Sequence, residues 1–215
     1  MPDYLPLFVD FSRKRVVIFG GGPVGERKAA YFAGADVTVI SREFTRGLEA
    51  MPTVKLVRRH VSESDARELI RGAFLVVVAT GDRALDRSLA RLAEGSGALV
   101  NCAEGDGDVI LPSKAARGDI TVAVSTGGRS PAMSRFIRER LEETLTDEHA
   151  DMVRLQAELR EALKKRLSSQ HEREKLLWDV LEDPGTWAAL RRSYDEALAL
   201  SLGKVRDGKH PNNEK

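Results

Sequence analysis

The chain lacks the sequence features that are typical of secreted, membrane and nucleic-acid-binding proteins. A single cysteine, Cys102, excludes an internal disulfide, and no apolar run approaches the ~18 residues needed to cross a bilayer. The formal net charge of +1 provides no overall attraction to nucleic acid. The first residues, MPDYLPLFVD, lack the basic and apolar regions of a signal peptide. We therefore predict a cytoplasmic protein with no membrane and no nucleic-acid partner.

The residues that are present indicate a folded globular chain. Of the 215 residues, 42% are hydrophobic and 31% are charged, and this length suits one large domain or a medium domain with a smaller one. The histidines stand far apart in the sequence, and none has another at metal-ligand spacing. They are His60, His149, His171 and His210. We therefore predict no metal site.

Strand-like and helix-like segments alternate over the first half of the chain. The segment 73–79, AFLVVVA, is continuously apolar, as expected of a strand buried on both faces. The strands are expected over 15–19, 36–40, 54–58, 73–79 and 98–101, with helices over 23–33, 63–71 and 83–93. Ser62 and Asp82 are the expected caps of the last two helices. This βαβ alternation predicts an α/β fold with a Rossmann-type parallel sheet.

The alternation of strand-like and helix-like segments ends after Asn101. The segment 119–125, DITVAVS, alternates apolar and other residues, which predicts a strand with one buried face. Ser130 and Pro131 are typical of an N-cap and a first helical position, and helix is expected from there to about residue 202. Two apolar stripes at helical spacing predict packed helix faces: Met152, Leu155, Leu159 and Leu163, then Trp187, Leu190, Tyr194 and Leu198.

The stretch VVIFGGGPVGERKAA, residues 16–30, places three spaced glycines between a strand and a helix. Gly20, Gly22 and Gly25 satisfy the spacing G-x-G-x-x-G, and the flanking strand and helix are the context that this motif requires. The first glycine permits the turn, the second lets the backbone approach a pyrophosphate, and the third allows close packing of helix on strand. We predict dinucleotide binding here, with Pro23 and Val24 beside the glycines, rather than a plain turn.

The acidic residue that usually holds the ribose hydroxyls is missing. It is expected about 20 residues after the first glycine, at the end of the second strand, where this chain has Ser41, Arg42 and Glu43. Ser41 or Glu43 can bind a hydroxyl, whereas Arg42 would favour a 2′-phosphate, so these residues leave NAD and NADP open. Thr80 and Gly81 end the fourth strand and are expected beside the cofactor.

Several segments in order resemble one family, that of precorrin-2 dehydrogenase / sirohydrochlorin ferrochelatase, the N-terminal part of siroheme synthase. The resemblance covers roughly residues 4–150. Its segments are LPLF (5–8), GGGPVGERKA (20–29), VVVATGDRALDRSLA (76–90), VNCAEGDGDVILPS (100–113) and TVAVSTGGRSPAMSRFIRERLE (121–142). It implies NAD-dependent oxidation of precorrin-2 to sirohydrochlorin and, in some members, insertion of ferrous iron to give siroheme. It also implies a homodimer.

On this resemblance the chain is expected to have four parts. Residues 1–112 would be the NAD-binding Rossmann domain, and 113–145 a segment that forms the dimer. Residues 146–202 would be a helical C-terminal domain. The polar end, 203–215, is expected to be a disordered tail.

The resemblance points to one carboxylate after the fifth strand as the acid–base group. The family has Asp in a segment like N-x-x-D, and the matching position here holds Glu104. Oxidation removes a proton as well as a hydride, and a carboxylate can accept that proton. Asp106 and Asp108 lie close by and can take this role, so Glu104 and Asp106 are the candidate catalytic residues. The alternative is that these are solvated loop acids with no catalytic role.

The segment after the strand 119–125 is the candidate substrate site. Precorrin-2 is a polycarboxylate, so a protein that holds it needs hydrogen-bond donors and positive charge. A Gly-rich run before a helix N-terminus provides backbone N–H groups, and Arg135 and Arg138 add cations nearby. The candidate residues are Ser125, Thr126, Gly127, Gly128, Arg129 and Ser130.

Two other functions fit the same sequence. The first is a non-catalytic module that senses NAD(H) and acts through its helical C-terminal region, a reading supported by Glu in place of Asp at position 104. The second is an unrelated dehydrogenase with a smaller substrate, which the STGGRSP segment argues against. Because fold does not settle function, the choice depends on the site.

Overall fold

The structure is a computed structural model that describes residues 4–103, 105 and 107–207. The chain forms two compact units that divide between Leu111 and Pro112. Within the described residues, no helix is both long enough and apolar enough to cross a membrane.

The first unit contains a five-stranded parallel sheet in the order β3-β2-β1-β4-β5. The predicted α/β class with a parallel sheet is therefore confirmed. The central strands are largely apolar because both of their faces are covered, and Val16 to Phe19 of β1 are fully buried. The strands are β1 (Arg15–Phe19), β2 (Asp36–Ser41), β3 (Val54–Arg58), β4 (Leu75–Val78) and β5 (Leu99–Cys102).

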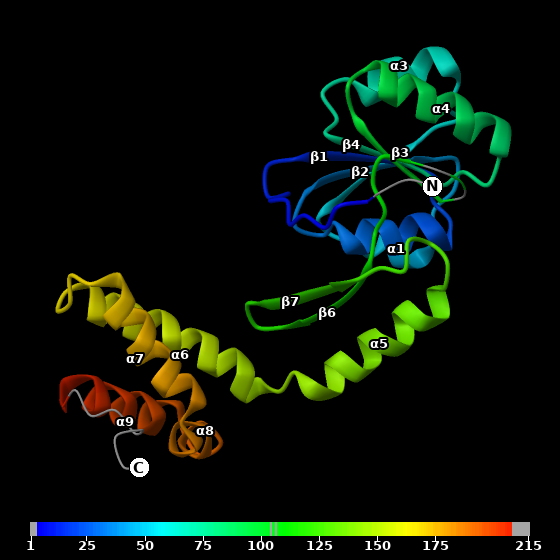
Figure 1. Cartoon of the computed structure of the whole chain (residues 1–215). Coiled ribbons are helices and arrows are strands. Elements are labelled where there is room, and N and C mark those ends of the chain that lie inside the picture. Colours follow the sequence, from blue (N-terminus) through cyan, green and yellow to red (C-terminus); the bar gives the residue numbers. More distant parts are fainter. Residues whose placement is uncertain (1–3, 104, 106, 208–215) are drawn as a thin grey trace. The chain divides into compact units, whose positions relative to one another are not determined.

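Helices cover both faces of this sheet (Figure 1), with α1 on one face and α3 and α4 on the other. Their caps follow the sequence, since Ser62 accepts from the backbone of Asp65 and Asp82 accepts from Ala84 and Leu85. The short helix α2 was not predicted, because four residues carry too little periodicity to be seen. The helices are α1 (Pro23–Tyr31), α2 (Arg46–Glu49), α3 (Glu63–Ile70) and α4 (Arg83–Gly95).

The second unit begins with an antiparallel hairpin of β6 (Ser113–Arg117) and β7 (Ile120–Val124), against which α5 (Pro131–Thr144) packs. The predicted alternation of β7 is confirmed, with its apolar residues half-buried and the others exposed. Strand β6 was not predicted, because its sequence, SKAAR, has low β propensity and buries only Ala115.

Four further helices enclose a separate apolar cluster. The stripe from Met152 to Leu163 is buried, as predicted. The second stripe is not one helix face: a turn after Leu190 divides it between α8 and α9, so that Leu190 is buried and Tyr194 begins a new helix. The helices are α6 (Asp147–Lys164), α7 (Gln170–Glu182), α8 (Pro184–Leu190) and α9 (Tyr194–Asp207).

The predicted disordered tail, 203–215, begins too early. Helix α9 continues to Asp207, because Val205 packs into the apolar cluster of this unit and so stabilises the last turn of the helix. Residues 208–215 lie outside the described residues.

Candidate dinucleotide-binding site

The glycine turn between β1 and α1 has the close contacts that the motif requires. Gly20 has a φ of 120°, and a Cβ atom built on it would lie 2.1 Å from the carbonyl oxygen of Ala79. A Cβ atom on Gly25 would lie 1.9 Å from the carbonyl oxygen of Gly20, so helix and turn pack without room for a side chain. Gly22, the N-cap of α1, has no neighbour within 4 Å of such an atom. Its backbone therefore borders open space, as a backbone that approaches a pyrophosphate must.

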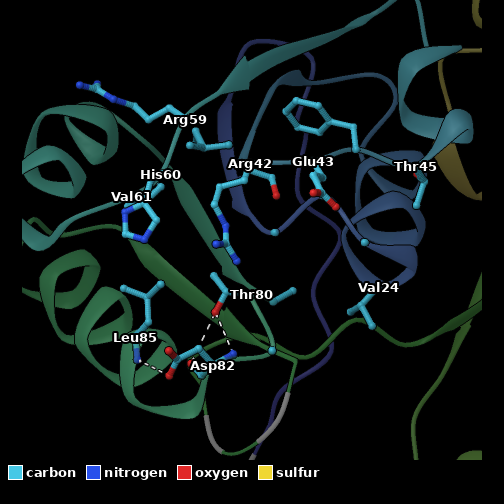
Figure 2. A pocket seen from close by; sticks show the side chains of 18 of the residues that line it. Val24, Arg42, Glu43, Thr45, Arg59, His60, Val61, Thr80, Asp82 and Leu85 are labelled. Atoms are coloured by element: carbon cyan, nitrogen blue, oxygen red, sulfur yellow. Dashed lines mark hydrogen bonds between the residues drawn. The ribbon is translucent and has the colours of Figure 1, made fainter.

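A cleft of about 710 Å³ opens above this turn. It is bordered by the segments that follow β1, β2, β3 and β4, the edge at which ligands bind in open α/β sheets (Figure 2). Nine of the ten residues predicted to contact a cofactor line it: Gly20, Gly22, Pro23, Val24, Ser41, Arg42, Glu43, Thr80 and Gly81. Gly25 does not, because it is packed beneath the turn. Cofactor contact by these residues stays a prediction.

Sequence reasoning missed other residues of the lining. His60 follows β3, and the rule that strand ends border the ligand would have found it. Gly21 has no room for a side chain, since a Cβ atom there would lie 2.1 Å from the carbonyl oxygen of Glu43. Asp82, which the sequence singles out as a helix cap, lines the cleft as well. The missed residues that carry no motif are Ile40, Phe44, Thr45, Arg59, Val61, Ala79 and Leu85.

Hydrogen bonds fix the turn after β4. The Thr80 backbone N–H and hydroxyl both donate to the Asp86 carboxylate, at 3.1 and 2.7 Å. Asp82 accepts from Ala84 at 2.9 Å, so it caps α4 as well as lining the cleft. Gly81 has a φ of 82°, a conformation that favours glycine. This wall of the cleft is therefore held in place before a ligand arrives.

Two arginines that follow one another at the end of β3 are each paired with a carboxylate. Arg58 contacts Glu49 at 2.9 Å, and Arg59 contacts Asp65 at 3.1 Å. The hydrogen bond from the Ser62 hydroxyl holds the pKa of Asp65 below its usual value, and the neighbouring positive charge of Arg59 acts in the same direction.

The two candidate catalytic residues, Glu104 and Asp106, lie outside the described residues. The segments around them are described. Ala103 donates its backbone N–H to Val78 at 2.9 Å, and Val109 donates to Val100 at 3.0 Å, so the chain leaves β5 and returns to its edge. Asp108 accepts from the backbone of Val100 at 3.0 Å. This hydrogen bond gives Asp108 a structural role, which makes Asp108 a weaker candidate for the acid–base role predicted for Glu104.

The predicted substrate loop, 125–130, lies in the second unit, and several hydrogen bonds within it hold its backbone. Gly127 donates to the Ser125 hydroxyl and Ser130 to the Thr126 hydroxyl, both at 3.1 Å, while Arg129 donates to the Thr126 carbonyl at 3.2 Å. Gly127 and Gly128 have φ of 60° and 77°. The loop is therefore shaped by its own hydrogen bonds.

The helix after this loop begins and continues largely as its sequence suggests. Ser130 caps α5 by accepting from Met133, as predicted. Arg135 and Arg138 pair with glutamates of α5, Arg135 with Glu139 at 2.8 Å and Arg138 with Glu142 at 2.5 Å, so their charges are already partly neutralised. In the described part of the chain, no three His, Cys, Asp or Glu side chains gather where they could hold a metal ion.

Comparison with known proteins shows the family. A family model described as "Putative NAD(P)-binding" matches residues 7–113, and the central domain of sirohaem biosynthesis proteins matches 117–144. A precorrin-2 dehydrogenase of Methanosarcina barkeri is 43% identical over 202 residues, which cover 91% of this chain and 90% of that protein. The chain belongs to the precorrin-2 dehydrogenase family. The resemblance seen in the sequence is thereby confirmed.

Other members of the family are longer or more distant. A siroheme synthase of Neisseria meningitidis serogroup B is 33% identical over 202 residues, which cover 92% of this chain but only 41% of that protein. A solved structure of SirC, a precorrin-2 dehydrogenase, matches with a TM-score of 0.72 and 25% identity, and covers 95% of this chain and all of the SirC chain. The NAD(P)-binding model spans the Rossmann unit and supports the predicted NAD cofactor.

Proposed function

We propose that this chain oxidises precorrin-2 to sirohydrochlorin, with NAD as the electron acceptor. The observation that carries the proposal is the 43% identity to a precorrin-2 dehydrogenase across nearly the whole length of both proteins. The cleft agrees with it, because the glycine turn, the end of β2 and the turn after β4 border one space.

The residues of the cleft suit a dinucleotide. The open face of Gly22 and the N-terminus of α1 would receive the pyrophosphate, since the first backbone N–H groups of a helix favour an anion. Thr80 and Gly81, held by Asp86, would border the nicotinamide half. When bound, NAD would accept a hydride from the substrate.

The proton that leaves with the hydride needs an acceptor, and we assign it to Glu104. The described segments on either side of it return to the edge of β5, the strand next to β4. Insertion of ferrous iron also requires loss of pyrrole protons, so the same carboxylate would serve iron insertion if the chain performs it. Iron would then be a substrate.

Variants of the two acids test this assignment. Glu104→Gln should keep dinucleotide binding and lower the rate of precorrin-2 oxidation by ~10²–10⁴-fold, the usual contribution of a positioned base. Glu104→Asp should be faster than Glu104→Gln, and Asp106→Asn should lose much less. A crippled Asp106→Asn beside a near-normal Glu104→Gln would move the role to Asp106. Wild-type rates in all three would exclude acid–base catalysis by this loop.

The loop 125–130 would bind substrate carboxylates through its remaining backbone donors. Because Arg135 and Arg138 are paired with glutamates, we expect the loop itself to contribute more than these arginines to binding of the substrate carboxylates. We further propose a homodimer, because the apolar face of β7 is only half-buried within the chain. We also propose that the protein is cytoplasmic, because its single cysteine cannot form an internal disulfide.

A further inference from the structure

We infer that Tyr4 is a positioning residue for the oxidation: its hydroxyl holds the loop that follows β5, and this loop carries the acid–base group. The inference rests on the proposed function, which assigns that role to Glu104. It concerns the first unit alone. Between β5 and the return of the chain to it, the structure describes Ala103, Gly105, Gly107 and Asp108.

The Tyr4 hydroxyl makes a contact between segments that are distant in the sequence. It donates to the backbone carbonyl of Gly107 at 2.9 Å, and the two residues lie 103 positions apart. Tyr4 does not occur among the described residues that line the dinucleotide cleft. The hydroxyl therefore acts on the loop after β5 and has no direct role in binding the dinucleotide.

The segment that carries Tyr4 is held at its two ends. At the far end Phe11 packs against Phe32 and Phe74, with ring centroids 5.1 and 5.4 Å away. The chain from Tyr4 to Phe11 forms no helix or strand, and Leu7 within it is 81% exposed. Because regular structure does not fix this stretch, the hydrogen bond from Tyr4 is a specific tether between the segment and the loop.

Tyr4 meets the loop where the chain packs again on β5. A Cβ atom built on Gly107 would lie 2.8 Å from the carbonyl oxygen of Val100, so Gly107 lies tightly against that strand. Two residues later, the carbonyl of Val109 accepts from the Asn101 side chain at 2.7 Å. Tyr4 thus adds a hydrogen bond from outside the sheet to the point at which the loop ends.

The loop needs such a restraint because of its glycines. Gly105 has a φ of 93°, a conformation that favours glycine, and Gly107 follows two positions later. Glycine permits a tight turn but leaves the backbone many other conformations. A group that takes part in the reaction must be placed accurately, since a displacement of about 1 Å can cost roughly 10²-fold in rate. A hydrogen bond to Gly107 is therefore expected to affect the rate through Glu104.

A purely structural role for Tyr4 is the competing interpretation. Loss of the hydroxyl would then lower the stability of the first unit, and the folded chain would react at the wild-type rate. A positioning residue instead lowers kcat in the folded chain and leaves the affinity for NAD unchanged. The two interpretations therefore predict different kinetics for the same variant.

Tyr4→Phe removes the hydroxyl and keeps the ring. We expect kcat for precorrin-2 oxidation to fall roughly tenfold, while a thermal melt shows a folded chain and calorimetry gives an unchanged Kd for NAD. Tyr194→Phe is the matched control, because the Tyr194 hydroxyl donates to Glu158 at 2.7 Å in the second unit and its loss should leave kcat unchanged. A wild-type kcat in Tyr4→Phe would overturn the inference, and so would an equal loss in both variants.

Combination with Glu104→Gln tests whether Tyr4 acts through the acid. Tyr4→Phe should then cost less than about twofold in a chain that already lacks the carboxylate, because residues that act as a unit are not additive. A tenfold loss in both backgrounds would show that Tyr4 acts independently of Glu104 and would overturn the inference.

Hydrogen exchange measured by mass spectrometry follows the loop without the reaction, and so separates this inference from the proposed function. Tyr4→Phe should speed exchange in peptides that span residues 103–109, whereas Tyr194→Phe should not. Unchanged exchange in Tyr4→Phe would overturn the inference. Faster exchange in Tyr4→Phe, together with a wild-type chain that leaves precorrin-2 unoxidised, would overturn the proposed function and leave the tether established.

Discussion

At the scale of single residues, the cleft depends on where side chains are absent. Gly20, Gly21 and Gly25 cannot carry a Cβ atom, because each would meet backbone within 2.1 Å or less. Gly22 differs, since the space beside it is open and its φ of −82° suits any residue. A substitution at Gly22 therefore tests the ligand, whereas one at its neighbours would test the fold.

Gly22→Asp should abolish dinucleotide binding and leave the chain folded. The new carboxylate would occupy and repel the pyrophosphate position, yet Asp is a favourable N-cap for α1. Calorimetry measures the binding, and a thermal melt checks the fold. Gly34→Asp is the control, because that glycine also has open space and does not line the cleft. Unchanged affinity for NAD in a folded Gly22→Asp variant would remove this turn from the site.

At the scale of elements, the sequence predicts the Rossmann unit well. Apolar runs mark its strands because both faces of the sheet are buried, and polar cap residues mark the starts of α3 and α4. The hairpin strand β6 could not be predicted, because its one buried residue is an alanine and the sequence shows no alternation of apolar and polar residues. The division between α8 and α9 depends on how their side chains pack, which a stripe of apolar residues does not specify.

The candidate site is predictable to a similar extent. Glycine spacing and strand ends indicate most of the residues that line the cleft. Phe44 and Thr45 line it only because the backbone after β2 follows a path that the sequence does not specify. The pairing of Arg58 and Arg59 with acids from other elements depends on tertiary contacts, so it could not be predicted from the sequence.

Asp183 joins two helices of the second unit and gives that unit a pH dependence. It caps α8 by accepting from Thr186 at 2.6 Å and pairs with Lys204 of α9. Burial alone would raise the pKa of Asp183, but the hydrogen bonds from Lys204 and Thr186 outweigh it and lower the pKa. Its stabilising contribution is therefore present above the unfolded-state pKa of about 4 and lost as the pH falls through the lower folded-state value.

Asp183→Ala should destabilise the second unit by about 2 kcal/mol at neutral pH, through loss of the cap and the ion pair. The difference from wild type should shrink below about pH 4. Urea unfolding followed by tryptophan fluorescence measures this unit alone, because Trp178 and Trp187, which lie in α7 and α8, are the only tryptophans. Asp195→Ala, at an exposed position of α9, should have little effect. An equal loss in both variants would refute the role of Asp183.

At the scale of the whole molecule, we predict a dimer. Exposed apolar side chains occur in both units, among them Leu7 and Phe8 in the first and Phe136 and Trp178 in the second. Burial of such side chains between two copies would be favourable. Light scattering should give twice the 23.7 kDa chain mass at micromolar concentration. A mass of one chain under these conditions would exclude the dimer.

The most direct test of the central claim is the reaction itself. Wild-type chain is mixed anaerobically with precorrin-2 and NAD, and the absorbance of sirohydrochlorin and of reduced dinucleotide is followed together. Because the oxidation transfers one hydride, we predict equal amounts of the two products, with no reaction when the dinucleotide is left out. A folded chain that binds the dinucleotide and leaves precorrin-2 unchanged would contradict the account and favour a non-catalytic sensor.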